Sequence, residues 1–175
     1  MINALVEELR VDEEIAEVVR SEGWYALGIP DHEPPFLYTI GLMLTLRHPE
    51  FIVFGLEDRE ARALCSQLVA DIRGGRSYAE PGVYSINIGT AVHRVGFRRV
   101  HPTQHELYLG FALGFARRMD RWGDIEVMQV FWPDSQGKFP FDAGCAWEVF
   151  ELQPRLDLGL SARELKQWRR QWGLD

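Results

Sequence analysis

Apolar positions along the chain follow two patterns, a spacing of three to four residues in some segments and short continuous runs in others. The first pattern is typical of amphipathic helices. It predicts four helices, over residues 12–22, 58–73, 103–122 and 161–172. Each begins with a side chain that can accept a hydrogen bond from a free backbone N–H. These residues are Asp12, Asp58, Thr103 and Ser161, the last two of which open capping boxes with Glu106 and Glu164.

The second pattern predicts strands, because runs rich in β-branched and aromatic residues fit a pleated, half-buried surface. Residues 51–56 are apolar throughout, which predicts a strand covered on both faces in the middle of the sheet. Two runs on either side of Gly89 predict an antiparallel hairpin. A Pro-rich loop over residues 30–35 separates the first two strands. The predicted strands span residues 24–29, 36–42, 51–56, 83–88, 92–100 and 125–132.

The order of these elements decides the fold class. It runs helix, strands, helix, hairpin, helix, strand, helix, which is not the strict alternation of a doubly wound parallel sheet. We therefore predict an α+β fold with about four helices packed on a mostly antiparallel, or mixed, sheet. The chain has no internal repeat and no Ser/Gly linker, so we predict a single domain over residues 1–175.

Composition and charge narrow the classes of partner and compartment. The formal net charge of −7 disfavours nucleic acid, whose binding depends on Lys and Arg displacing counterions. The most apolar run, residues 36–46, is shorter than the about 20 residues that a membrane span needs. Residues 1–10 lack the cationic start of an export signal, and the two cysteines form no CxxC pair. We expect a cytoplasmic protein with no membrane association.

Neither a metal site nor a cofactor site has a signature in the sequence. His101 and His105 are four residues apart, but Pro102 and Thr103 begin a helix between them, so the two do not share a helix face as zinc ligands do. Adjacent side chains in the loop segment 31–33 (Asp, His, Glu) point apart. The segment 74–77 (GGRS) lacks the spacing of a phosphate-binding loop. We expect no metal and no cofactor.

Three other features leave two interpretations open. Cys145 is either a packed or a reactive thiol, whereas Cys65 lies on an apolar helix face that is typical of inert packing. Acidic and aromatic residues between 132 and 148 form either a general-acid site or a turn with aromatics folded onto the core. The C-terminal helix carries cations beside two tryptophans, typical of a solvated basic face above a packed stripe or of a nucleic-acid contact. The residues concerned are Asp134, Asp142 and Glu148 with Trp132, Phe139, Phe141 and Trp147, and then Arg163, Lys166, Arg169 and Arg170 with Trp168 and Trp172.

Three motifs in a fixed order carry a resemblance to a known family. They are residues 36–42 (FLYTIGL), 48–56 (HPEFIVFGL) and 129–134 (QVFWPD), the last followed by Gly137, Pro140 and the Gln153-Pro154 pair. Over about residues 21–154 the chain resembles the bacterial domain of unknown function 4262. That resemblance implies a bacterial cytoplasmic protein and brings no established activity, substrate or catalytic residue.

The motif residues include polar side chains at strand ends, where α+β proteins often form a pocket. We predict that the ends of the strands 36–42, 51–56 and 125–132 converge on one aromatic-lined cleft, with His48 and Asp134 at its rim. The predicted binding residues are Tyr38, Thr39, His48, Glu50, Trp132 and Asp134.

We expect this cleft to belong to a non-catalytic binding or interaction module. Its partner would be another protein, a small-molecule ligand or a second copy of the chain, because interface cores favour Trp, Tyr and Phe. The alternative is a hydrolase-like enzyme that uses His48 and Asp134 as acid/base groups.

Overall fold

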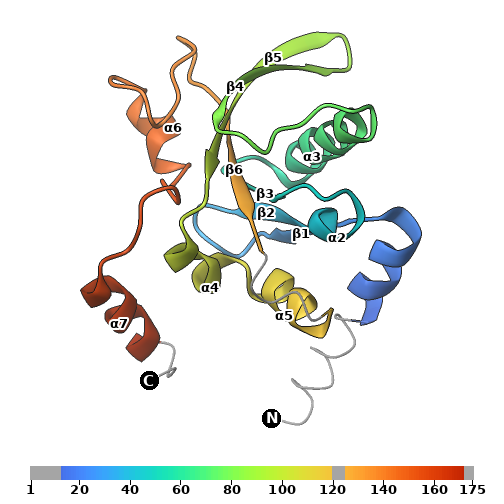
Figure 1. Ribbon diagram of the computed structural model, residues 1–175. Coiled ribbons are helices and arrows are strands. Elements are labelled where there is room, and N and C mark those ends of the chain that lie inside the picture. The colour runs from blue at the N-terminus through green and yellow to red at the C-terminus, as the bar shows by residue number, and fades with distance from the viewer. Residues whose placement is uncertain (1–12, 120–124, 172–175) are drawn as a thin grey trace.

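The centre of the fold is a six-stranded mixed sheet, seen in a computed structural model that describes residues 13–119 and 125–171 (Figure 1). The strand order is β1-β2-β3-β6-β5-β4. Neighbouring strands are antiparallel except β3 and β6, which are parallel. The strands are β1 (Tyr25–Ile29), β2 (Phe36–Ile40), β3 (Glu50–Phe54), β4 (Gly82–Ile88), β5 (Ala91–Arg99) and β6 (Val127–Phe131). The predicted α+β class and mostly antiparallel sheet are confirmed.

The described residues form more helices than the four that the sequence predicts. Residues 13–22 are helical, and Gly23, with φ of 86°, ends that helix. The proposed cap of this helix, Asp12, lies outside the described residues. The other helices are α2 (Leu42–Thr45), α3 (Asp58–Arg73), the 3-10 turn η1 (Pro102–Gln104), α4 (His105–Tyr108), α5 (Gly110–Arg118), α6 (Trp147–Glu151) and α7 (Ala162–Gln171). None of these is long and apolar enough to cross a membrane, nor is the helix over residues 13–22.

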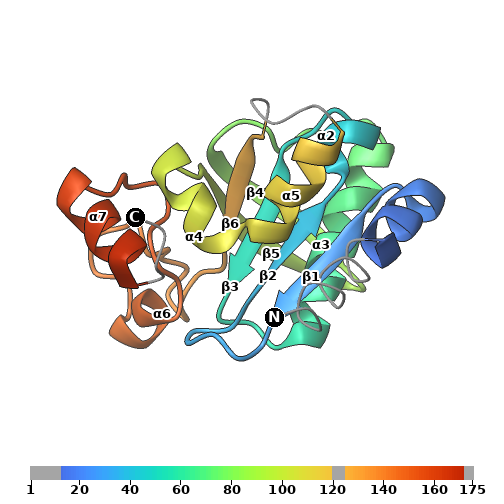
Figure 2. The same ribbon diagram turned by 90° about the horizontal axis from the view of Figure 1, so that it is seen from below.

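The two faces of the sheet bury separate hydrophobic clusters. On one face, Phe51 and Val53 of β3 pack with side chains of α3 such as Leu68. On the other face, Ile52 packs with Phe115 of α5 and with the helix over residues 13–22. Figures 1 and 2 show α3 and α5 on opposite sides of the sheet. All five residues of β3 are buried, which confirms the predicted central strand.

The predicted helix over residues 103–122 is wrong as one continuous element. The chain leaves helical geometry at Leu109, with φ of −120° and ψ of 30°, so that α4 ends there and α5 begins at Gly110. Leu109 is fully buried, and glycine at the next position weakens a continuous helix. The predicted cap at Thr103 is also wrong, because its backbone N–H donates to the His101 ring instead. Residues 120–122 lie outside the described part of the chain.

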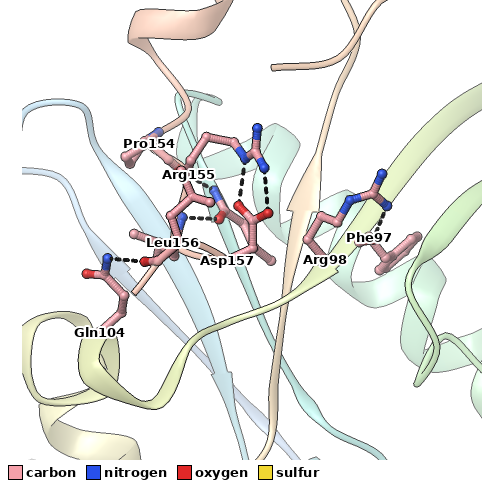
Figure 3. Close-up of polar contacts among 9 residues, drawn as sticks. Phe97, Arg98, Gln104, Pro154, Arg155, Leu156 and Asp157 are labelled. Atoms are coloured by element: carbon pink, nitrogen blue, oxygen red, sulfur yellow. Dashed lines mark hydrogen bonds and ion pairs between the residues drawn. The ribbon is translucent and has the colours of Figure 1, made fainter. Parts of the chain in front are cut away.

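The C-terminal segment crosses the second face of the sheet and is held there by buried amides. The side chain of Gln129 on β6 donates to the carbonyl of Pro154 at 2.6 Å and accepts from the N–H of Leu156 at 2.9 Å. Gln104 donates to the carbonyl of Leu158 at 2.9 Å. Figure 3 shows these bonds. They position α6 and α7 on the side of the molecule away from β1 (Figures 1 and 2).

The C-terminal helix itself forms as the sequence predicts. Ser161 and Glu164 make the reciprocal capping box, with Glu164 accepting from the Ser161 N–H at 2.8 Å and Ser161 Oγ accepting from the Glu164 N–H at 3.3 Å. Trp168 is half-buried, and Trp172 lies outside the described residues. Arg169 forms an ion pair with Glu106 at 3.5 Å, which connects α7 to α4.

Candidate functional site

The predicted site residues that stand at strand ends are divided between two opposite edges of the sheet. By these edges we mean the two ends of its central strands, where the chain enters and leaves the sheet. Since β3 and β6 are parallel, both begin at one edge, where Glu50 is paired with Val127. β2 runs antiparallel to β3 and therefore ends at that same edge. Trp132 and Asp134 follow the other end of β6. Five residues at about 3.3 Å each separate the edges by roughly 15 Å. The prediction that all these strand ends converge on one cleft is wrong.

Tyr38 belongs to the interior of the second cluster. Its ring stacks on Phe36, with ring centroids 6.2 Å apart, and its hydroxyl bonds to the backbone of Phe111. Burial raises the pKa of the Tyr38 hydroxyl, so it stays protonated. We therefore assign Tyr38 a role in core packing, and this role does not depend on the predicted cleft.

His48 uses both ring nitrogens in structural bonds. Nδ1 lies 2.8 Å from the carbonyl of Pro49, and Nε2 accepts from the N–H of Tyr78 at 3.0 Å. The two bonds together require the neutral ring with its hydrogen on Nδ1. Burial lowers the pKa of His48, which favours the same neutral form. His48 thus anchors the segment before β4 and has no free nitrogen for a substrate.

Asp134 organises the loop after β6. Its Oδ1 accepts from the N–H groups of Gln136 at 2.8 Å and Lys138 at 2.9 Å, and its Oδ2 accepts from the N–H of Ala146 at 2.9 Å. The backbone bonds from Lys138 and Ala146 lower the pKa of Asp134, so the carboxylate holds no proton to donate. His48 and Asp134 do not form the acid/base pair that the hydrolase alternative requires.

Trp132 is also part of the framework. Its indole N–H donates to the carbonyl of Phe54 at 2.9 Å, and its backbone N–H and carbonyl both pair with the side chain of Gln153. The Gln-Pro motif at 153–154 is thereby explained as an anchor of the C-terminal segment. Trp132 and Asp134 hold the β6 end of the molecule together.

Thr39 and Glu50 come together at the other edge. The Thr39 hydroxyl donates to Glu50 Oε2 at 2.7 Å and accepts from the N–H of Phe51 at 2.8 Å. Glu50 Oε1 accepts from the backbone N–H groups of Gly41 at 2.8 Å and Met43 at 3.2 Å, at the start of α2. The Glu50 carboxylate therefore fixes the turn that leads from β2 into α2.

Gly41 makes that turn sterically possible. Its φ of 106° lies in the left-handed region that favours glycine, and a Cβ at this position would stand 2.7 Å from Cγ1 of Val19. The close approach lets the two N–H groups point at Glu50. The TIGL segment (residues 39–42) and the HPE segment (residues 48–50) are therefore linked in the fold, because residues 39 and 41 donate hydrogen bonds to the carboxylate of Glu50.

Glu50 is only 4% exposed, and its surroundings change its acidity. Burial raises the pKa of its carboxyl group to about 7, against the hydrogen bonds from Thr39 and from the backbone of Met43, Gly41 and Leu42, which lower it. Near neutral pH the group therefore exists in both protonation states. A carboxyl of this kind can accept or donate a proton, or can bind a cationic group.

Glu50 also lines a hollow whose other walls are almost entirely apolar. Its volume is about 30 Å³, and Leu44 and Met119, which are 45% and 40% exposed, are among its lining residues. The sulfur of Met43 accepts from the N–H of Glu126 at 3.0 Å, which fixes one wall. The full lining is Ile40, Gly41, Met43, Leu44, Glu50, Ala112, Phe115, Ala116, Met119 and Ile125.

Sequence reasoning found Glu50 and Thr39 but missed the apolar residues that line the hollow. Phe115 and Met119 carry the helical period of a core-facing stripe, and nothing in that period distinguishes a filled core from a hollow one. The alanines at 112 and 116, one helical turn apart, are the only signal, because small side chains facing a sheet leave space. Within residues 13–119 and 125–171, no group of three His, Cys, Asp or Glu side chains is arranged to hold a metal ion.

Comparison with known proteins gives one match. A family model described as "Domain of unknown function (DUF4262)" matches residues 18–146, which include Glu50 and every residue that lines the hollow. No curated protein and no solved structure matches the chain.

Proposed function

The chain belongs to the DUF4262 family, and from the geometry around Glu50 we propose that it is a non-catalytic binding module for a small, mainly apolar ligand with one amine or hydroxyl group. The ligand's apolar part would lie between α2 and α5. Its polar group would meet the Glu50 carboxyl group.

A single observation carries this proposal, namely a buried carboxyl group that lines an otherwise mainly apolar hollow. The Glu50 carboxylate accepts hydrogen bonds from Thr39, Gly41 and Met43, and the backbone of Leu42 also stabilises its charged form. A ligand donor that enters the hollow would add a further hydrogen bond to this carboxylate. A protonated amine would form a charge-assisted bond there, which is stronger than a neutral one.

The size of the hollow limits what can enter without rearrangement. About 30 Å³ holds one or two water molecules. A larger ligand needs the exposed side chains Leu44 and Met119 to rotate outward. Methionine has three rotatable bonds and adapts to different shapes, so Met119 is suited to this role.

The test is an NMR titration of protein labelled at the methionine methyl groups, with isobutylamine and the matched neutral isobutanol as probes. Met43 and Met119 line the hollow, whereas Met128 lies in the opposite cluster and serves as an internal reference. We expect saturable shifts at the first two and none at the third.

Two variants make this test specific. Glu50→Gln is expected to weaken isobutylamine binding by about 10-fold and isobutanol binding much less, because only the amine loses a charge-assisted bond. Ala116→Leu fills the hollow and should abolish binding of both probes. Glu57→Gln removes an exposed carboxylate and is the matched control. Amine binding that survives both Glu50→Gln and Ala116→Leu would refute the proposal.

A second candidate, a protein partner or a second copy of the chain, is favoured by an exposed aromatic pair on α6. Trp147 is 63% exposed and Phe150 is 41% exposed, with their rings stacked at 5.6 Å. Exposed aromatic residues are typical of interface cores. Sedimentation of the wild type and of Trp147→Ala tests it, since a self-associating wild type should become more monomeric in the variant.

The bacterial cytoplasm is the compartment that fits this proposal. Cys65 and Cys145 are both free thiols, and a reducing compartment keeps thiols in that state. Burial raises the pKa of Cys65 to about 12, which supports packing as its role.

A further inference from the structure

We propose that Arg98, held on the ring of Phe141 beside Arg155, forms a second binding site that takes the oxyanion group of a ligand, either a phosphate or a carboxylate. The site lies on the second face of the sheet, over β5, and shares no residue with the hollow at Glu50.

The aromatic base of this site is closely fixed to the sheet. Phe141 packs directly over Gly96 of β5, where a Cβ would stand 2.8 Å from Cζ of the phenyl ring. Phe139 lies parallel to Phe141, with ring centroids 5.1 Å apart, and Phe131 meets it edge-on at 5.4 Å. The ring therefore has little freedom to move.

Arg98 lies on this ring. Its guanidinium carbon is 3.7 Å from the ring centroid of Phe141, a distance at which the cation is attracted to the face of the ring. This contact holds the guanidinium group in place, and a guanidinium group on a ring face can still present an N–H edge to an oxyanion. An edge held in this way is suited to bidentate recognition of an oxyanion, because little side-chain freedom is lost on binding.

The hydrogen-bonding capacity of Arg98 is largely unused. A guanidinium group has five N–H donors, and the bond to the carbonyl of Phe97 at 2.9 Å uses one of them (Figure 3). Over residues 13–119 and 125–171, no carboxylate forms an ion pair with Arg98. Arg98 is half-buried, so its charge is partly removed from water without a counter-charge. An incoming oxyanion would supply that counter-charge.

Arg155 and Asp157 define one border of the site. Arg155 donates twice to Asp157, both bonds at 2.6 Å, and its guanidinium carbon lies 6.0 Å from the same Phe141 centroid. Figure 3 shows the Arg155–Asp157 ion pair and, on a neighbouring segment, Arg98 with its single bond to the carbonyl of Phe97. Since Asp157 neutralises Arg155, Arg98 supplies the uncompensated charge. On the neighbouring ring, Arg94 lies 5.7 Å from the centroid of Phe139 and adds positive charge.

Calorimetric titration of the full chain with inorganic phosphate and, separately, with malonate tests the proposal. We expect saturable binding of at least one of them with a Kd in the range of about 1 mM, as is typical of a single small anion. Binding of phosphate alone identifies a phosphate-bearing ligand, and binding of malonate alone identifies a carboxylate. No saturable binding of either would overturn the proposal.

Variants on the same strand supply the matched control. Arg98→Gln should weaken anion binding by about 10-fold or more, because a charge-assisted pair of bonds is lost. Arg99→Gln removes the same charge from the next residue, which is exposed and already paired with Glu126 at 2.6 Å, and should change binding by less than about twofold. Equal weakening in both variants would show a general charge effect and overturn the site.

Arg98→Lys separates recognition from folding. It keeps the positive charge but loses the planar fork, so we expect intermediate binding with an unchanged melting temperature. It also serves as the test variant if Arg98→Gln does not fold. Wild-type affinity in Arg98→Lys would refute bidentate recognition. Glu50→Gln should leave anion binding unchanged, which keeps this test independent of the function proposed above.

Discussion

Raising the pH through neutrality is expected to destabilise this protein through Glu50. The pKa of its carboxyl group is about 7 in the folded chain, against an ordinary value of 4.5, because burial disfavours the charged form. The folded state therefore binds this proton more tightly than the unfolded state does. The stability that Glu50 contributes is complete below about pH 4.5 and is lost as the pH rises through about 7.

The size of the effect follows from the two pKa values. At about 1.4 kcal/mol for each unit, the full loss is roughly 3 kcal/mol, and most of it falls between about pH 5 and about pH 8. His48 and His105, whose pKa values burial lowers, act in the opposite direction, since they lose stability as the pH falls. A comparison with Glu50→Gln cancels both histidines, because the two proteins share them.

Urea unfolding of the wild type and Glu50→Gln at several pH values measures this difference. The glutamine amide can keep the bonds from Gly41 and Met43 and can donate to Thr39, so the variant preserves the shape of the site. Relative to the wild type, Glu50→Gln should gain about 2–3 kcal/mol between about pH 5 and about pH 8. The exposed Glu57→Gln should show no such trend. A difference between wild type and Glu50→Gln that stays constant with pH would refute the reasoning.

Three further predictions concern the framework. Gly41→Ala should destabilise the fold by about 2 kcal/mol or more in urea unfolding, since its φ is 106° and Val19 stands in the way of a Cβ; an unchanged midpoint contradicts this. Asp134→Ala releases three backbone N–H groups, so trypsin should cut after Lys138 faster than in the wild type; equal rates contradict the anchoring role. Gln129→Ala should lower stability by about 2–3 kcal/mol and speed hydrogen exchange in segment 154–158, whereas unchanged exchange would show that the segment is held by other contacts.

Local patterns in the sequence determined several elements correctly. The continuous apolar run at 51–56 predicts a strand buried on both faces, and β3 is that strand. The Ser161 and Glu164 pair predicts a helix start because both bonds of a capping box form within four residues. The hairpin around Gly89, which has φ of 61°, is equally local. In each case the residues that decide the structure are neighbours in the chain.

Contacts between distant segments decided the rest. The break at Leu109 depends on its burial against the sheet, and helical periodicity across residues 103–119 gives no sign of it. α6 forms without a capping signal. Both outcomes depend on packing partners far away in the chain, which a local pattern does not contain.

The candidate site shows the same division. The sequence identified Thr39 and Glu50 as polar residues at strand ends, and by the same reasoning it grouped them with Trp132 and Asp134. Which strand ends share an edge depends on the direction in which strands pair, and that is set by the whole sheet: β2 runs antiparallel to β3, while β6 runs parallel to it. The sequence by itself determined which residues are chemically capable, and the tertiary structure alone decided which of them meet.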